Sequence, residues 1–226
     1  MEHQNRSESP PQSNRTIDIV DWGVLPFAEA HRRQLAFLDE RIAGQRPDTI
    51  FLVEHPHVYT YGRSAAKDLP EKITVLNQEV AQVAIERGGD VTYHGPGQLV
   101  IYPILDVRAL TGDLHAFLHW LEDVLIDTIA AWGVTGRHHP EHTGVWVDDH
   151  KIASIGVAVR KWISYHGAAL NVETDLRFFD AIQPCGLPSD VMTSLAALLG
   201  RRITIKDVKA ALLRALDFHG VRPRVC

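Results

Sequence analysis

Residues 151–186 read KIASIGVAVRKWISYHGAALNVETDLRFFDAIQPCG, and the rest of the chain is organised around this stretch. Two runs within it, 151–159 and 162–172, are rich in β-branched and aromatic residues, and the basic pair Arg160 and Lys161 separates them. Runs of this composition joined by a short polar break are typical of a β-hairpin. We therefore expect a hairpin at the centre of the fold.

The two ends of this stretch carry reactive side chains. Cys185 lies between Pro184 and Gly186, which suits a thiol presented on a tight turn. An unperturbed thiol has a pKa of about 8.5, and a nearby cation raises its thiolate fraction at neutral pH. Lys151 can act as that cation, and His94 and His166 are alternative partners that spacing alone does not exclude. An inert buried cysteine is the competing interpretation.

Composition predicts one ordinary globular domain. The chain has 226 residues, of which 45% are hydrophobic and 23% charged, and we assign 16–226 to a single domain. Residues 1–15 are polar and proline-containing, which predicts a disordered tail. The net charge of −5 argues against nucleic-acid binding. Two cysteines, no leader and no long apolar run favour a cytoplasmic protein without a membrane span.

Helical and strand patterns alternate along the chain. Apolar spacing predicts helices over 27–42, 113–132, 189–199 and 204–220, with Asp113 and Thr204 as N-caps. Strands are expected over 16–20, 49–53, 83–86, 99–107 and 143–147, and a polar loop over 54–63. The expected fold class is α+β (mixed α/β), with a central mixed β-sheet and flanking helices.

Residues 87–98, RGGDVTYHGPGQ, contain four glycines and indicate a binding loop. Glycine at this density lets backbone N–H groups approach a ligand. The run matches neither Walker A nor GxGxxG, so it predicts no triphosphate or dinucleotide site. An elaborate turn that leads into the strand over 99–107 is the alternative.

Three histidines, His138, His139 and His142, lie in the segment before the strand over 143–147. Zinc sites need three or four ligands at supportable spacing, and adjacent histidines point in different directions. No CxxC or HExxH motif accompanies them. The sequence therefore favours a polar loop, and we expect no metal.

Several motifs in a fixed order resemble a known family. RGGDVTYHGPGQLVIYP is followed by GVWV, KIASIGV, YHGAALNV and PCG. Together they resemble the octanoyl-acyl-carrier-protein:protein octanoyltransferases of lipoate biosynthesis, also called the lipoate-protein ligase B family. The resemblance covers about 16–216 and implies the fold shared by biotin and lipoate protein ligases. His142 departs from the family pattern, in which an arginine is common.

The resemblance also implies site residues. It assigns the acyl thioester to Cys185 and its activation to Lys151. It implies that three segments bind the acyl group: Arg87, Gly88, Gly89, Asp90, Val91, Thr92, Tyr93 and His94; Ser154, Ile155 and Gly156; Gly167, Ala168 and Ala169.

The family's reaction is ping-pong acyl transfer. The resemblance implies that the donor is octanoyl-acyl carrier protein, which carries the acyl group on its phosphopantetheine arm, and that no further cofactor is needed. The implied acceptors are apo lipoyl domains of 2-oxoacid dehydrogenases and the glycine cleavage H protein. Alternatives are an ATP-dependent lipoate or octanoate ligase, which would not need the thiol of Cys185, an amidotransferase between lipoyl-type proteins, and a non-enzymatic binding module.

Overall fold

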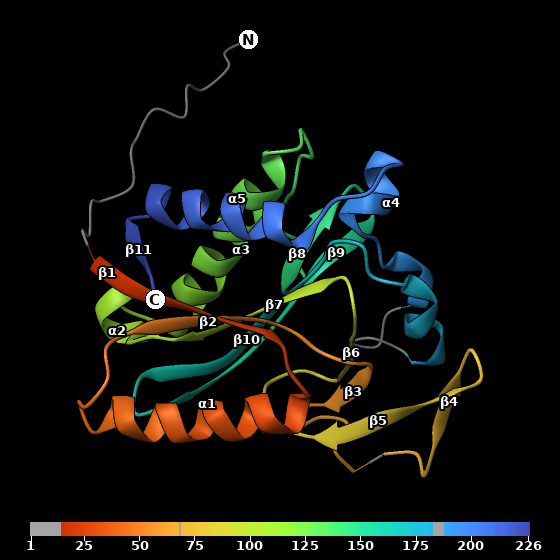
Figure 1. Cartoon of the computed structure of the whole chain (residues 1–226), viewed down its shortest axis with the longest axis horizontal. Helices are drawn as coiled ribbons and strands as arrows, with labels where there is room; N and C mark the ends of the chain where they lie inside the picture. Colours follow the sequence, from red (N-terminus) through yellow and green to blue (C-terminus); the bar gives the residue numbers. More distant parts are fainter. Residues whose placement is uncertain (1–14, 68, 183–187) are drawn as a thin grey trace.

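The computed structural model describes residues 15–67, 69–182 and 188–226, and its main sheet has seven strands in the order β11-β1-β2-β7-β10-β9-β8 (Figure 1). β11 and β2 run parallel to β1, whereas the other neighbours pair antiparallel, so the sheet is mixed as predicted. Its strands are β1 (Arg15–Val24), β2 (Thr49–Glu54), β7 (Gln98–Ile104), β8 (Gly144–Val147), β9 (His150–Arg160), β10 (Ile163–Asn171) and β11 (Val221–Val225).

Helices cover both faces of this sheet (Figure 1). On one face, α3 (Leu114–Ala130) and α5 (Ile205–Phe218) pack on one large apolar cluster, while α1 (Phe27–Ile42) buries Ala30 and Leu38 on the other face. The predictions of these three helices, over 27–42, 113–132 and 204–220, are confirmed. Both predicted N-caps form, because the Asp113 carboxylate accepts the Ala116 N–H and the Thr204 hydroxyl accepts the Asp207 N–H.

The central hairpin is confirmed in β9 and β10, with its turn one residue later than the predicted break at Arg160 and Lys161. Its turn residues Lys161 and Trp162 have φ of 49° and 69°, the left-handed pair that matches strand twist in two-residue hairpins. β10 is buried along its whole length because β7 and β9 flank it and helices cover its faces. The hairpin therefore lies inside the sheet and provides a rigid base for side chains.

A second sheet has the order β4-β5-β3-β6 and corrects the predicted loops. Its strands are β4 (Ile73–Val75), β5 (Gln78–Ala84), β3 (Val58–Tyr61) and β6 (Val91–His94). The loop expected over 54–63 is wrong for β3, which is buried throughout. Its tyrosines fit an apolar layer because each hydroxyl finds a partner; the Tyr59 hydroxyl donates to the Phe178 carbonyl at 2.6 Å.

Near the C-terminus, the helix expected over 189–199 is wrong in extent. Ser189–Val191 form a short 3-10 turn (η3), and only Leu195–Leu199 form α4, capped by Ser194. The break occurs because the Thr193 N–H donates to the Lys151 carbonyl, which ties this segment to β9. The short helix α2 (Val107–Leu110) and strand β11 were not predicted. Among the described residues, no helix is long and apolar enough to cross a membrane.

Candidate active site

Lys151 lies near the start of β9 and is 3% exposed. Its ammonium Nζ is 5.8 Å from the ring centroid of Trp146 on the neighbouring strand, a separation at which an aromatic face attracts a cation. Its aliphatic stem fits because Gly144 has no side chain: a Cβ there would lie 2.7 Å from Lys151 Cε. The fold thus holds a buried lysine in a fixed position.

Cys185 lies outside the described residues, within 183–187. The described chain ends before it at Ile182, after the 3-10 helix η1 (Leu176–Ala181), and resumes at Pro188. Shortly after that, Met192 forms a parallel bridge with Lys151. Among the described residues, the backbone at Met192 is therefore fixed against the strand that carries the lysine.

A pocket opens where β9 and β10 face the segment before β6. It encloses about 500 Å³ of empty space, its open mouth included. Its apolar wall contains Phe27, Ile85, Val100 and Tyr102. Gly167 belongs to this wall, and a Cβ there would lie 2.1 Å from the Ile101 carbonyl oxygen, so only glycine lets β10 approach β7 this closely.

Most of the predicted acyl-binding residues meet at this pocket. The positions that line it are Arg87, Gly88, Gly89, Thr92, His94, Ser154, Ile155, Gly156, Gly167, Ala168 and Ala169. Asp90, Val91 and Tyr93 do not line it. Val91 and Tyr93 point the other way from β6, into the apolar cluster around Phe178, because alternate residues of a strand face opposite sides. Substrate contact by all these residues stays a prediction.

Sequence reasoning missed the apolar wall. Phe27 carries no motif, and Tyr102 lies in the family motif RGGDVTYHGPGQLVIYP but was not among the predicted site residues; their patterns predicted core positions in a helix and a strand. The Tyr102 hydroxyl bonds to the His55 ring at 2.7 Å. A tyrosine in an otherwise aliphatic strand was the signal that could have marked this position, since a buried hydroxyl needs a partner.

Buried side-chain hydrogen bonds connect the pocket to β9. The Arg87 guanidinium donates to the Thr60 carbonyl at 2.8 Å, and the His94 ring bonds to Gln98 Oε1 at 2.8 Å. The Gln98 amide donates to Asn171 Oδ1 at 2.9 Å, and the Asn171 amide donates to the Thr193 carbonyl at 3.0 Å. Thr193 in turn donates its N–H to the Lys151 carbonyl. Pocket and lysine therefore share one hydrogen-bonded frame.

His94 is neutral at physiological pH. Burial first, and then the nearby His55, lower its pKa to about 3 against the raising effect of the Gln98 hydrogen bond. A neutral imidazole adds no positive charge to the pocket. His94 is accordingly suited to positioning Gln98 and less suited to activating a thiol as an imidazolium.

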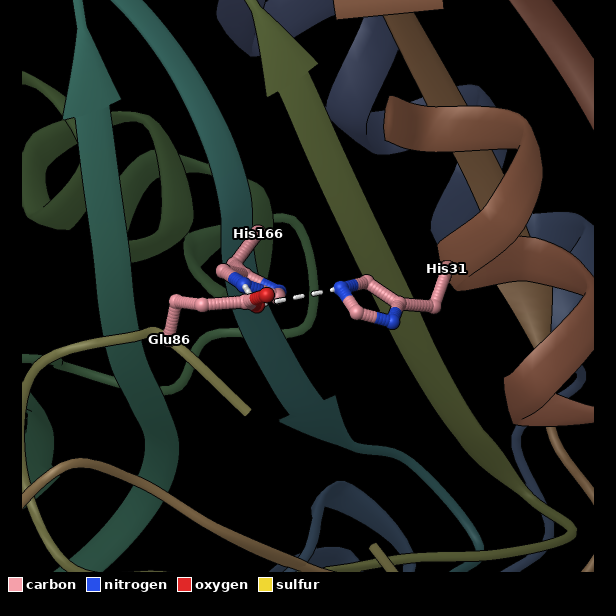
Figure 2. Close-up of side chains that lie close together, drawn as sticks. All are labelled: His31, Glu86 and His166. Carbon is pink, nitrogen blue, oxygen red and sulfur yellow. Dashed lines mark hydrogen bonds and ion pairs between the residues drawn. The ribbon is translucent and has the colours of Figure 1, made fainter. Parts of the chain in front are cut away.

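A second imidazole, His166, faces a carboxylate at the pocket wall. Figure 2 shows the Glu86 carboxylate between His31 and His166, with Oε2 at 3.2 Å from His31 Nε2 and 3.5 Å from His166 Nε2. Burial lowers the pKa of His166 to about 3. His166 also has φ of 57°, in the left-handed region that residues with a Cβ rarely adopt. This unusual backbone turns its ring toward the pocket.

The comparisons with known proteins agree with this architecture. Residues 26–217 match the family described as the lipoyl protein ligase A/B catalytic domain. An octanoyltransferase of Syntrophotalea carbinolica is 44% identical over 197 residues, covering 87% of this chain and 91% of that protein. An octanoyltransferase of Rubrobacter xylanophilus is 46% identical over 195 residues, covering 84% and 87%.

Solved structures share the fold at low identity. A lipoate-protein ligase A bound with ATP superposes with a TM-score of 0.71 at 15% identity, covering 94% of this chain and 88% of that chain. The biotin protein ligase of Aquifex aeolicus in complex with biotin and ATP gives 0.52 at 12% identity, covering 91% and 69%. The predicted biotin/lipoate protein ligase-like fold is confirmed.

Proposed function

Because the chain belongs to the lipoyl protein ligase A/B catalytic-domain family and its role is octanoyl transfer in lipoate biosynthesis, we propose a two-step route through Cys185. The donor is octanoyl-acyl carrier protein, and the acceptor is the lysine amine of an apo lipoyl domain, as in 2-oxoacid dehydrogenases or the glycine cleavage H protein. A buried lysine fixed on the strand that also lines the apolar pocket is the observation that carries this proposal.

In the first step, the Cys185 thiolate attacks the thioester carbonyl of the donor. The Cys185 S–C bond forms, the donor C–S bond breaks, and the phosphopantetheine thiolate leaves and takes a proton. A lysine ammonium at about 4 Å from a thiolate attracts it by about 4 kcal/mol at an effective dielectric of 20, before desolvation is subtracted. That attraction favours the thiolate and gives Lys151 the role of activating cation and proton donor.

The pocket provides the space in which the proposed route places the acyl chain. Ser154 is three residues along β9 from Lys151, which places it about 10 Å away at the rise of an extended strand. An acyl chain on a thiol beside Lys151 therefore reaches the pocket, where Ala168 and Ala169 leave room beside Val100 and Tyr102. Burial of the chain contributes roughly 0.8 kcal/mol per methylene.

In the second step, the neutral amine of the acceptor lysine attacks the Cys185 thioester. A C–N bond forms, the C–S bond breaks, and the amine proton passes to the departing thiolate, directly or through Lys151. Conversion of a thioester into an amide is downhill, so the route requires no nucleotide.

Intact-protein mass after brief exposure to octanoyl-acyl carrier protein tests the proposal. The parent chain should gain one octanoyl group that hydroxylamine removes, and Cys185→Ala should gain none. Lys151→Ala should load more slowly, while Lys161→Ala, which removes an exposed turn lysine, serves as the matched control.

Different donors separate the alternatives. Transfer that needs ATP and free octanoate, with no adduct from the carrier protein, would overturn the proposed route in favour of an adenylate-forming ligase. Loading from an octanoylated lipoyl domain but not from the carrier protein would identify an amidotransferase.

A further inference from the structure

A histidine and carboxylate cluster lies apart from the pocket, between α3 and the segment that precedes β8. His119 and Glu122 are three residues apart on one side of α3, and His138 approaches them from the segment. Glu122 Oε2 is 2.9 Å from His119 Nδ1 and 2.7 Å from His138 Nδ1, and the two nitrogens are 3.4 Å apart. Three potential ligand atoms therefore converge on one point.

The geometry of the cluster matches that of a small divalent metal ion. Zinc ligands lie about 2.0–2.1 Å from the metal, so adjacent ligand atoms in a tetrahedral site are roughly 3.3 Å apart. The separation of the two nitrogens, 3.4 Å, matches that value, and the two nitrogen–oxygen separations of 2.7 and 2.9 Å are shorter, so Glu122 Oε2 would move outward by about half an ångström around an ion. The imidazole rings meet at an interplanar angle of 68°, which lets both in-plane lone pairs point to a common position.

A carboxylate on the far side of His138 supports the same conclusion. His138 Nε2 lies 2.8 Å from Asp123 Oδ1, so the ring donates its Nε2–H to Asp123, and its Nδ1 is the atom that faces Glu122. A carboxylate that orients a ligating histidine in this way recurs in zinc proteins. The Glu122 oxygen carries only lone pairs, so either a proton on Nδ1 or a metal cation lies between the two atoms, and a metal would take the place of that proton.

We propose that His119 Nδ1, His138 Nδ1 and Glu122 Oε2 bind one Zn²⁺ or a similar divalent transition metal ion, with solvent completing the coordination. Two imidazoles and one carboxylate form a ligand set that zinc accepts. The side chains of His119 and His138 are 66% and 40% exposed, which gives the ion access, whereas Glu122 is 4% exposed and fixed in place.

The second histidine and glutamate cluster is less suited to a metal. His31 and His166 stack with an interplanar angle of 22°, and their nitrogens are 3.2 and 3.5 Å from Glu86. Nearly parallel stacked rings direct their in-plane lone pairs side by side, so the two nitrogens do not converge as well on one ion. This cluster therefore serves as the internal comparison.

The proposed site lies next to Lys151, the lysine to which the proposed function gives the catalytic role. The other Glu122 oxygen, Oε1, accepts the Gly144 N–H at 2.7 Å, and the side-chain space above Gly144 is taken by Lys151. A metal on Oε2 would withdraw negative charge from this carboxylate. Metal loading is therefore expected to alter acyl transfer as well as to bind.

Titration calorimetry with Zn²⁺ on the untagged full chain tests the site. A Cys185→Ser, Cys226→Ser background removes thiols that would bind zinc themselves. We expect one Zn²⁺ per chain, loss of this binding in His119→Ala and in His138→Ala, and binding weakened 10- to 100-fold in Asp123→Asn. His150→Ala, an exposed histidine outside the cluster, and His31→Ala should bind like the parent.

Two further readouts complete the test. Affinity should fall at pH 6, because metal binding displaces protons from the histidines. Circular dichroism of the metal-free variants should match the parent, since both histidines are at least partly exposed. No zinc uptake, uptake unchanged in both His119→Ala and His138→Ala, or uptake lost only in His31→Ala would each overturn the proposal.

Discussion

Acidification from pH 7 to pH 5 should destabilise this protein strongly, because three histidines are buried in neutral form. His55, His94 and His166 are each at most 7% exposed. Burial lowers the pKa of His55 to about 4 and the pKa values of His94 and His166 to about 3. In the unfolded chain each imidazole titrates near 6.5.

The sign and size of the effect follow from proton linkage. Well above pH 6.5 neither state binds protons at these sites, so their contribution to stability is fully present. As the pH falls below 6.5, the unfolded chain binds protons at these histidines and the folded chain does not. The free energy of unfolding therefore falls by about 1.4 kcal/mol per pH unit for each histidine. Between pH 7 and pH 5 this is about 2 kcal/mol per histidine, or about 5 to 6 kcal/mol together.

Urea unfolding at pH 7, 6 and 5 measures this loss. His94→Gln should reduce it by about a third, because one neutral histidine is removed, and His150→Ala should leave it unchanged since that histidine is exposed. The pKa of His138 is raised by Glu122 and Asp123 against its partial burial, so His138 opposes the loss. A change below about 1 kcal/mol over this range would refute the reasoning.

Three substitutions test the site geometry. Gly144→Ala places a Cβ 2.4 Å from the Ala153 carbonyl oxygen at a φ of 131°, so it should lower the free energy of unfolding by about 3 kcal/mol and slow Cys185 loading. The control Gly133→Ala is strained at a φ of 75° but meets no neighbouring atom, so urea unfolding should show a smaller loss. Ala169→Leu fills the pocket and should raise the KM for octanoyl more than for butanoyl donors in a steady-state assay, and equal effects on both would contradict the assigned acyl pocket. Asn171→Ala leaves the Thr193 carbonyl and a Gln98 N–H without their partner, so unfolding should show a loss of about 2 kcal/mol, and unchanged stability would argue against the shared frame.

The proposed metal site combines two residues of one helix with one residue of a segment distant in the sequence. The sequence indicated His138, His139 and His142 as a group, and their proximity in the chain argued against a shared ligand set. In the structure, His139 and His142 pack on Trp146, whereas His138 faces α3. The pair His119 and Glu122, three residues apart on a helix, was the signal that could have directed attention to α3.

The sequence alone determined the features that depend on neighbouring residues. The helix 27–42, the caps Asp113 and Thr204 and the hairpin with its turn at Lys161 all follow from local periodicity and local hydrogen bonds, and the structure confirms them. The ordered motifs also identified the family, because several separate matches in one order are far more specific than any single loop.

Tertiary structure decided the features that depend on distant segments. The strands β3 and β6 are short and rich in polar atoms, and they form because each supplies the other's backbone partners across thirty residues of chain. The pocket wall from Phe27 and Tyr102, the fixed position of Lys151 against Gly144 and the meeting of His119 with His138 likewise require packing between separate elements. Local propensity cannot encode such contacts, because the free energy that selects them arises only when the sheet and its covering helices assemble.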